Sequence, residues 1–308
     1  MLSKILVKSK LYIVGVSAGP DSLFLLDNLR KAAYRVIVAH VNYKKRAESD
    51  QEEELVKNYC QKYSLPYEIY PVQGLEYNSV SNFQDRARKI RYDFFQKLAQ
   101  KYQTKYIVVA HHFDDHLETY LLQKQRKSLV DYWGLPIKTK QEKYWILRPL
   151  LNLSKQQIFH YLAAQKITYA TDQTNQLPIY QRNIIRQKLN NLSSGGKTNL
   201  AQEIKEKNQA LSKIKILVKL AMKNLINSTH ILQLEKEKKY SSEVYLRLLY
   251  IWINQATNGV LQQRKKQLLA EVYKQLFTSK KTSLSIELGS NFRIVKGNNQ
   301  AVILPKNK

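Results

Sequence analysis

The chain has 308 residues and a formal net charge of +27, because 51 lysines and arginines face 24 aspartates and glutamates. This excess favours a polyanionic partner, either a nucleic acid or an anionic membrane surface. The alternative is a lysine-rich solvated surface on an ordinary enzyme. A hydrophobic content of 44% excludes wholesale disorder. The single cysteine, Cys60, excludes an intrachain disulfide framework, a zinc ribbon and a cysteine-liganded iron–sulfur cluster.

The sequence contains no pattern typical of a membrane-spanning segment or a signal peptide. No run approaches the eighteen apolar residues of a membrane span, and residues 1–10 lack the apolar core of a signal peptide. We therefore expect a cytoplasmic protein. The charge is also uneven, since residues 1–154 hold 25 basic and 16 acidic residues, whereas residues 155–308 hold 26 and 8. The second half, at +18, is the part expected to meet a polyanion.

The first half alternates apolar runs with helical patterns. Runs at 11–16, 35–41 and 106–110, with a weaker one at 67–72, predict strands buried on both faces. Apolar stripes at 21–31, 50–63 and 83–102 predict helices between them. This alternation indicates an α/β fold with a Rossmann-like parallel sheet, whose site lies at the carboxyl ends of the strands.

The second half changes character. Residues 154–165 predict a helix capped by Ser154, and Ser-Ser-Gly-Gly at 193–196 predicts a linker. We expect a catalytic domain at 1–195 and a basic accessory region at 196–308. Amphipathic patterns predict helices at about 200–277, and alternating residues at 283–304 predict a small β-meander.

The strongest local signal is a loop that follows the first strand and opens the first helix. It consists of Ser17, Ala18, Gly19, Pro20, Asp21 and Ser22. Small residues and hydroxyls at a helix N-terminus favour an anion, and a carboxylate beside a phosphate implies a bound cation such as Mg²⁺. The loop is neither a Walker A motif nor GxGxxG. An ordinary strand–helix turn with an aspartate cap is the structural alternative.

Polar residues also follow the strand at 106–110. The segment contains His111, Asp114, Asp115 and Glu118, and the last two lie three residues apart on one helical face. Paired carboxylates suit a metal or an amine, and a histidine can hold a metal or donate to a developing anion. The alternative is a polar helix N-terminus with acids placed for the helix dipole.

Two further clusters are basic. Arg88 and Arg91 share one helical face, and Arg182 and Arg186, with Asn183 between them, share another. Guanidinium groups suit phosphates and base edges. A solvated basic helix face explains either cluster equally well.

The loop resembles that of the pyrophosphatase-loop (PP-loop) ATP enzymes, which have an adenine-nucleotide alpha-hydrolase-like fold. Together with residues 39–42, 85–92, 111–119, 148–150 and 182–186, it closely resembles the tRNA(Ile)-lysidine synthetase family over about residues 10–190. Three positions depart from the family pattern. Ala18 replaces a glycine, Asp85 replaces a glutamate, and Tyr43 stands where a histidine is common. We expect neither Asp85 nor Tyr43 to touch the chemistry, and Ala18 to matter if its φ is positive.

The resemblance implies a two-step reaction on the isoleucine tRNA with a CAU anticodon. ATP adenylates the C2 oxygen of the wobble cytidine, and the ε-amine of L-lysine then displaces AMP to give lysidine. It implies ATP and Mg²⁺ as cofactors, with the loop and His40 at the nucleotide and Asp21 at the metal. A homodimer is a further expectation from the family.

The residue roles that the resemblance suggests are hypotheses. Arg88, Arg91 and His111 would surround the flipped-out base, and Asp115 and Glu118 would hold the lysine amine. Asp114 would face the metal or the base. The substrate-binding set also includes Arg182, Asn183 and Arg186.

Three other readings compete with this one. A related tRNA thiolase needs paired cysteines or an iron–sulfur cluster, which a single Cys60 does not provide. A small-molecule synthetase or amidotransferase on the same loop leaves the basic second half unexplained. A non-catalytic RNA-binding module would form no AMP or pyrophosphate from ATP, lysine and tRNA.

Overall fold

The computed structural model describes residues 5–44, 48–73, 80–171, 181–235, 239–259, 261 and 266–306, without the side chains of 80–84 and 181. The chain forms two units. Unit 1 comprises Met1–Tyr120 and Gly134–Lys197, and unit 2 comprises Leu121–Trp133 and Thr198–Lys308. In the described part of the chain, no helix is both long and apolar enough to cross a membrane.

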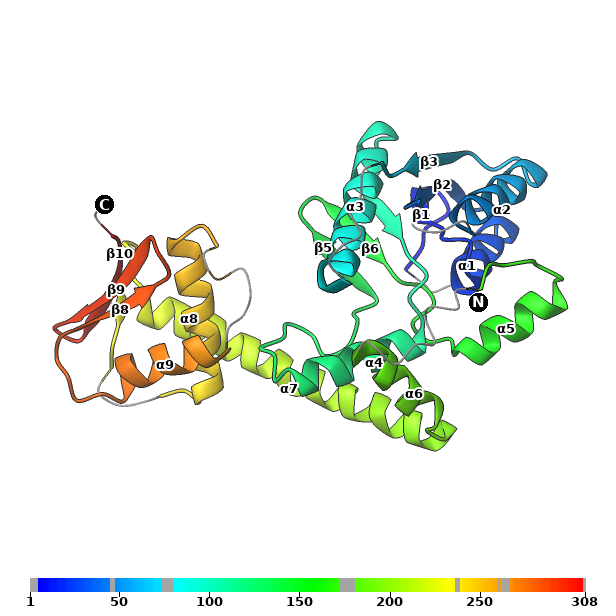
Figure 1. Cartoon of the computed structure of the whole chain (residues 1–308). Coiled ribbons are helices and arrows are strands. Elements are labelled where there is room, and N and C mark those ends of the chain that lie inside the picture. The colour runs from blue at the N-terminus through cyan, green and yellow to red at the C-terminus, as the bar shows by residue number, and fades with distance from the viewer. Residues whose placement is uncertain are drawn as a thin grey trace. The chain divides into compact units, whose positions relative to one another are not determined.

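Unit 1 is built on a six-stranded sheet (Figure 1). Its order is β3 (Tyr67–Pro71), β2 (Arg35–Asn42), β1 (Leu11–Gly15), β4 (Tyr106–Val108), β6 (Tyr144–Leu147) and β5 (Lys138–Gln141). All neighbours are parallel except β5, which pairs with β6 in antiparallel fashion. The predicted parallel sheet is confirmed. The pair β5–β6 was missed because the edge strand β5, Lys-Thr-Lys-Gln, has no apolar run.

Helices cover both faces of this sheet, as its apolar strands require. On one face, α1 (Pro20–Lys31), α2 (Glu48–Lys62) and α5 (Lys155–Ala164) share a core with the strands. On the other face, α3 (Val80–Lys101) packs Phe95 and Leu98 against Ile13 and Ile107. The helices predicted at 21–31, 50–63, 83–102 and 154–165 are therefore present, with small shifts at their ends.

The order in which strands are added to the sheet reverses at β1, because β2 and β3 lie on one side of it and β4 lies on the other. A parallel sheet opens a crevice at such a point, outside the carboxyl ends of the strands. The loop that begins at Val16 and the turn that contains His111 both leave the sheet there, and α4 (Phe113–Gln125) starts directly after that turn. The fold thereby places the two strongest motifs side by side.

The linker predicted at 193–196 is wrong. Ser194, Gly195 and Gly196 form the first turn of α7 (Ser194–Leu225), which follows α6 (Gln181–Asn190). Ser193 caps this helix, because its Oγ accepts a hydrogen bond from the Gly196 N–H at 3.1 Å. A cap satisfies one of the free N–H groups of the first turn, so two glycines are tolerated there.

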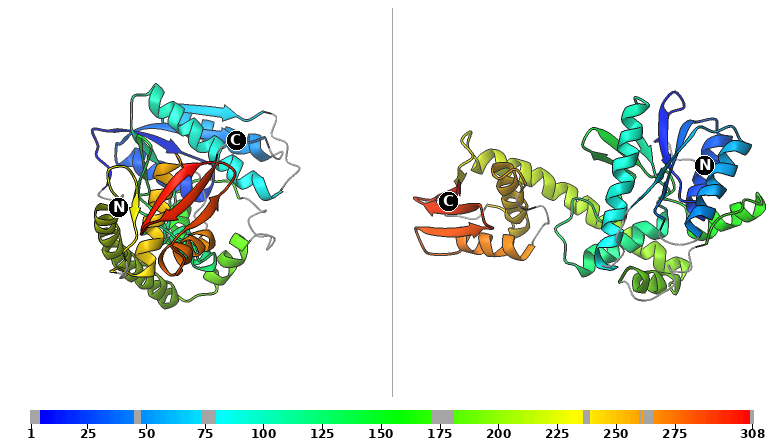
Figure 2. Two further views of the ribbon diagram at one scale, coloured as in Figure 1. Left: turned by 90° about the vertical axis from the view of Figure 1, so that its left-hand side faces the viewer. Right: turned by 45° about the horizontal axis from the view of Figure 1, so that its top comes forward.

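Unit 2 combines helices with a small antiparallel sheet. The sheet order is β7 (Leu232–Gln233), β10 (Gln300–Pro305), β9 (Phe292–Gly297) and β8 (Leu284–Leu288). Figure 2 shows the last three strands in orange and red beside α9. α8 (Ser242–Ala256) and α9 (Lys266–Phe277) share their core with this sheet. The predicted meander is confirmed, and the two-residue strand β7 is an addition to it.

Candidate active site

A cavity of about 780 Å³ lies in unit 1 and is lined by residues that the chain supplies from several elements. Its volume is within the range of small-molecule sites. The lining consists of Ser17, Gly19, Pro20, Asp21, Tyr43, Glu52, His112, Asp114, Asp115, Glu118, Lys155, Phe159, Tyr169, Ala170, Thr171, Asn183, Arg186, Gln187, Leu189 and Asn190. The loop after β1 and the acidic start of α4 therefore face the same space, as the sequence predicted.

The loop is organised by its two serines. The Ser22 Oγ accepts a hydrogen bond from the Ser17 N–H at 3.1 Å and donates one to the Gly19 carbonyl at 2.9 Å. Gly19 is the N-cap of α1, and no side chain caps this helix. Its first N–H groups and its dipole therefore stay available to an anion in the cavity.

Ala18 occupies a strained backbone conformation in the middle of this loop. Its φ is 60°, in the left-handed region that favours glycine, and its side chain is buried. An alanine in this region costs about 1 kcal/mol relative to glycine. The replacement of the family's glycine by Ala18 therefore does have a conformational consequence.

Asp21 carries a carboxylate oxygen that nothing in the described structure satisfies. Its Oδ1 is buried, and no described residue donates a hydrogen bond to it. Burial raises the pKa of Asp21, although the neighbouring His112 acts in the opposite direction. A buried carboxylate oxygen without a hydrogen-bond partner is a suitable ligand for a hard cation. A bound phosphate could supply further oxygen ligands to the same cation. No group of three or more potential metal ligands is found among the described residues.

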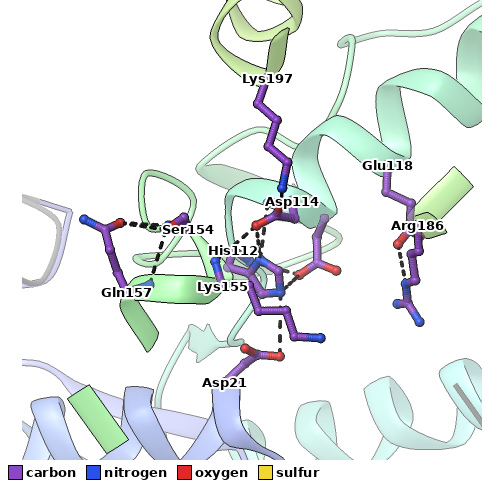
Figure 3. Close-up of polar contacts among 10 residues, drawn as sticks. Asp21, His112, Asp114, Glu118, Ser154, Lys155, Gln157, Arg186 and Lys197 are labelled. Carbon is purple, nitrogen blue, oxygen red and sulfur yellow. Dashed lines mark hydrogen bonds and ion pairs between the residues drawn. The ribbon is translucent and has the colours of Figure 1, made fainter. Parts of the chain in front are cut away.

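His112 lies at the centre of three carboxylates (Figure 3). Its Nε2 is 3.7 Å from Asp21 Oδ2 and 3.5 Å from Asp115 Oδ2. Its Nδ1 lies 3.2 Å from the Asp114 backbone nitrogen and 3.6 Å from Asp114 Oδ2. Burial alone would lower the pKa of His112, but the carboxylates of Asp114, Asp115 and Asp21 outweigh it and raise this pKa.

Asp114 ties three segments of unit 1 together. Its Oδ1 lies 2.5 Å from the Lys197 Nζ in the first turn of α7, and its Oδ2 accepts a hydrogen bond from the Lys155 N–H at 3.1 Å. Burial would raise the pKa of Asp114, but the bonds to His112, Lys197 and the Lys155 backbone hold it far below its usual range. The Asp114 carboxylate is therefore charged and fully engaged.

Asp115 and Glu118, the predicted amine-binding pair, differ in their surroundings. The Asp115 Oδ2 accepts only the His112 N–H, at 3.0 Å, in the hydrogen bonds described for it. His112 and His111 outweigh the effect of burial and lower the pKa of Asp115, so its carboxylate is ionised. The buried Glu118 accepts hydrogen bonds from Arg182 on one oxygen and from the Arg186 Nε on the other, at 2.7 Å for Arg186. Glu118 thus anchors α6.

His111, Arg88 and Arg91 do not line the cavity. Burial lowers the pKa of His111, and its charged neighbours Arg148, Arg88 and Arg91 lower it further, which keeps the ring neutral. The His111 Nδ1 is buried and has no partner among the described residues. These groups form a second polar cluster beside α3. Tyr43 connects it to the cavity, because Tyr43 lines the cavity and its hydroxyl donates to the Ala87 carbonyl at 2.9 Å.

His40 lies beneath the loop and is absent from the cavity lining. Its Nδ1 is 2.9 Å from the Val16 carbonyl, and its Nε2 is buried without a described partner. Burial lowers the pKa of His40, so the ring is neutral and Nδ1 is its donor. His40 therefore positions the start of the loop.

Sequence reasoning missed several residues that line or support the cavity. Lys155 follows the predicted cap Ser154, and the Gln157 side chain completes a capping box with that serine. Phe159, one turn further, packs its ring 5.8 Å from that of Tyr169. The only signal for Lys155 was its place directly after a predicted helix cap. Lys197, next to the supposed linker, had none.

Comparison with known proteins identifies this arrangement. Residues 2–193 match the family model for a PP-loop domain. A tRNA(Ile)-lysidine synthase of Mycoplasma mycoides subsp. mycoides SC is 37% identical over 302 residues, which cover 96% of this chain and 74% of that protein. One from Mycoplasmopsis pulmonis is 32% identical over 307 residues, which cover 96% of this chain and 99% of that protein.

Solved structures support the fold. A U34-tRNA thiolase from Methanococcus maripaludis has a TM-score of 0.57 and 16% identity, over 68% of this chain and 76% of that one. Its likeness concerns the fold alone. The PP-loop model matches more than half of the chain, and the two lysidine synthases align with almost all of it. The chain therefore belongs to the tRNA(Ile)-lysidine synthase family.

Proposed function

We propose that this protein ligates L-lysine to C2 of the wobble cytidine in the isoleucine tRNA with a CAU anticodon. Family membership supports lysidine formation on tRNA(Ile) with ATP. The observation that carries the proposal is the cavity. It joins a phosphate-binding loop to an unsatisfied carboxylate, Asp21, and to an ionised one, Asp115.

In the first step, the C2 oxygen of cytidine attacks the α-phosphorus of ATP, and pyrophosphate leaves. The open N-terminus of α1 and the hydroxyl of Ser17 would hold the phosphates in place, while Ser22 maintains the shape of the loop through its bonds to Ser17 and Gly19. Mg²⁺ at Asp21 would screen the phosphate charge. The His112 Nε2 lies between the carboxylates of Asp21 and Asp115. It would thereby reduce the electrostatic repulsion between them.

In the second step, the lysine ε-amine attacks C2, and AMP leaves with the former base oxygen. Asp115 is the proposed acceptor for the amine, because it is ionised and lines the cavity. Arg186 lines the same cavity and suits the α-carboxylate of lysine. Glu118 holds Arg182 and Arg186, so we assign it the positioning of these arginines, with Asn183 on the same helix, rather than direct contact with the amine.

The flipped-out base needs donors along its edge. We propose the second polar cluster, Arg88, Arg91 and the neutral His111, for this role. Its position beside the cavity, across Tyr43, supports the assignment. These residues would then act on the base while the loop acts on the nucleotide.

A sulfur-transfer reaction is disfavoured by the one thiol of the chain. Cys60 is buried in α2 and does not line the cavity. Burial raises the pKa of Cys60 to about 12, so the nucleophilic thiolate is scarce at neutral pH. Thiolation would require a reactive cysteine or a cluster that this sequence does not supply.

We further propose that residues 1–195 catalyse the reaction and that residues 196–308 bind the body of the tRNA. The exposed lysines of α7, Lys205, Lys213, Lys219 and Lys223, support this role by their charge. A salt titration of tRNA binding should lose slope when these lysines are replaced by glutamine. A cytoplasmic location and a homodimer are part of the proposal, and sedimentation of the purified protein tests the dimer.

The decisive experiment is mass analysis of the tRNA after incubation with ATP and lysine. The expected product gains the mass of one lysine less one water, at the anticodon. Asp115→Asn should still release pyrophosphate but should raise the KM for lysine. A tRNA of unchanged mass, with no AMP formed, would exclude the proposed function.

A further inference from the structure

Two basic side chains line the cavity, those of Lys155 and Arg186, and among the described residues only Arg186 has an ion-pair partner. Arg186 is bound to Glu118. The Lys155 ammonium has no hydrogen bond or ion pair with any residue that the structure describes. Its closest recorded neighbour is the ring of Phe159, whose centroid lies 5.6 Å away. An ammonium that lines a cavity without an ion-pair partner can bind an anionic group of a ligand.

Lys155 is held at this place by its own backbone. It is the first residue of α5, whose N-cap Ser154 forms a capping box with Gln157. The Lys155 N–H donates to Asp114, which also binds His112 and Lys197. The side chain is thus anchored at its base and extends beside Asp21, as Figure 3 shows. Burial raises the pKa of the Asp21 carboxyl, and the Lys155 ammonium acts against this rise.

Asp21 belongs to the first turn of α1, at the end of the phosphate-binding loop. The loop residues Ser17 and Gly19, Asp21 and Lys155 line the same cavity, so an anion bound at the loop shares that cavity with the Lys155 ammonium. We propose that Lys155 binds the β- and γ-phosphates of ATP and stabilises the pyrophosphate that leaves on adenylation of the base. This inference rests on the proposed use of ATP by the same cavity.

The chemistry of the first step explains why a cation is useful there. The base oxygen forms a bond to the α-phosphorus, the bond from that phosphorus to the α–β bridging oxygen breaks, and the electron pair stays on pyrophosphate. The leaving group gains one negative charge. A cation placed in advance lowers the cost of this charge and needs no reorganisation during the reaction.

The test is equilibrium binding of ATP, pyrophosphate and AMP, each with Mg²⁺, to the full-length protein and to Lys155→Met. Loss of a charge-assisted bond should weaken ATP and pyrophosphate about tenfold to hundredfold. AMP binding and the KM for lysine should stay unchanged. Lys155→Arg should recover part of the affinity, and the adenylation kcat should fall in Lys155→Met.

Lys10→Met is the matched control. Lys10 is exposed and directly precedes β1, at the end of that strand opposite to the loop. The Lys10→Met substitution removes the same charge and should leave the affinities for ATP, pyrophosphate and AMP unchanged. Substitution of Lys155 keeps the backbone bond to Asp114, and thermal unfolding of the variant checks that α5 stays folded.

Each outcome decides the proposal. Equal ATP affinity in the protein and in Lys155→Met would overturn it. An equal loss for AMP and ATP would place the ammonium at the α-phosphate and would overturn the assignment to the leaving group. A raised lysine KM with unchanged ATP binding would assign Lys155 to the amino acid instead. Absence of ATP binding by the unaltered protein would contradict the proposed function itself.

Discussion

Two aspartates on the same helix, Asp21 and Asp27, are treated in opposite ways by this fold. Asp27 accepts bonds from the hydroxyls of Tyr59 and Tyr161, both at 2.6 Å, and from Arg30 at 2.6 Å and Lys31 at 3.0 Å. Burial would raise the pKa of Asp27, but these donors lower it to about 2. Asp21, near the start of α1, has a buried oxygen without a described partner and a raised pKa.

The comparison separates a structural carboxylate from a functional one. Asp27 joins α1 to α2 through Tyr59 and to α5 through Tyr161, so its charge contributes to the stability of unit 1. Asp21 contributes no such bond, and its unsatisfied oxygen is expected to cost free energy until a ligand arrives. The same substitution at both sites should therefore act on different properties.

Asp21→Asn should have the largest effect, and it should act on activity alone. Loss of the charge at the proposed metal and phosphate site should lower lysidine formation at least about a hundredfold. The free energy of unfolding should be unchanged or higher, because the variant no longer buries a charged group with an unsatisfied oxygen, Oδ1. Urea denaturation and product analysis of the same sample test both statements. An active but less stable variant would reverse the distinction.

Asp27→Asn should act on stability. Loss of the charged acceptor should lower the free energy of unfolding by about 2–3 kcal/mol. The folded fraction should keep its ATP affinity within a factor of about three, since Asp27 does not line the cavity. A drop in ATP affinity as large as that of Asp21→Asn would show that the link from Asp27 to α5 serves the site.

The pH dependence of stability should depend on the same carboxylate. A carboxyl whose pKa is lower in the folded state stabilises the protein above the pKa of the unfolded chain and loses this effect as pH falls. For Asp27, with a folded pKa of about 2, the loss should occur between about pH 4 and pH 2. The difference in unfolding free energy between the protein and Asp27→Asn should shrink over this range. A constant difference would mean that the pKa of Asp27 is the same in the folded and the unfolded state.

Tyr161→Phe should have a smaller effect, because it removes one of the four donors to Asp27. The free energy of unfolding should fall by about 1 kcal/mol. Tyr63→Phe is the control, since no described residue bonds to the Tyr63 hydroxyl, and it should be nearly neutral. An equal loss in both variants would show that the hydrogen bond to Asp27 is not the cause of the loss.

Ala18→Gly should have the smallest effect. Release of the strain at a φ of 60° is opposed by loss of a buried methyl group and by the greater freedom of glycine in the unfolded chain. The terms nearly cancel, so thermal unfolding should report a change below about 1 kcal/mol. A loss above this value would show that the methyl group supports the loop more than the strain opposes it.

Much of the fold of unit 1 could be predicted because its central strands are continuous apolar runs. The strands β1, β2 and β4 are buried on both faces, and burial selects valine and isoleucine. The edge strand β5 is mostly exposed and polar, so pairing with β6 alone determines it. Ser-Ser-Gly-Gly at 193–196 has the composition of a linker. In the structure it begins a helix, because Ser193 caps the first turn.

The candidate site was predictable only where its residues follow strands. Asp21 and Asp115 lie in the first turns of α1 and α4, the helices that follow β1 and β4, and the sheet brings such positions together. Lys155 and Lys197 belong to the first turns of helices later in the chain. Their spacing in the sequence does not predict that these turns pack beside the site. Glu118, Arg182 and Arg186 were all identified, but their mutual pairing depends on the packing of α6 against α4.

The burial of Cys60 has a practical consequence for spectroscopy. A thiol whose pKa is about 12 reacts slowly with maleimides near neutral pH, and it is inaccessible as well. Cysteines introduced at exposed positions, such as Lys97 in unit 1 and Lys280 in unit 2, could therefore carry a fluorophore pair while Cys60 stays in place. The distance between the two units, with and without tRNA, becomes directly measurable in an otherwise native chain.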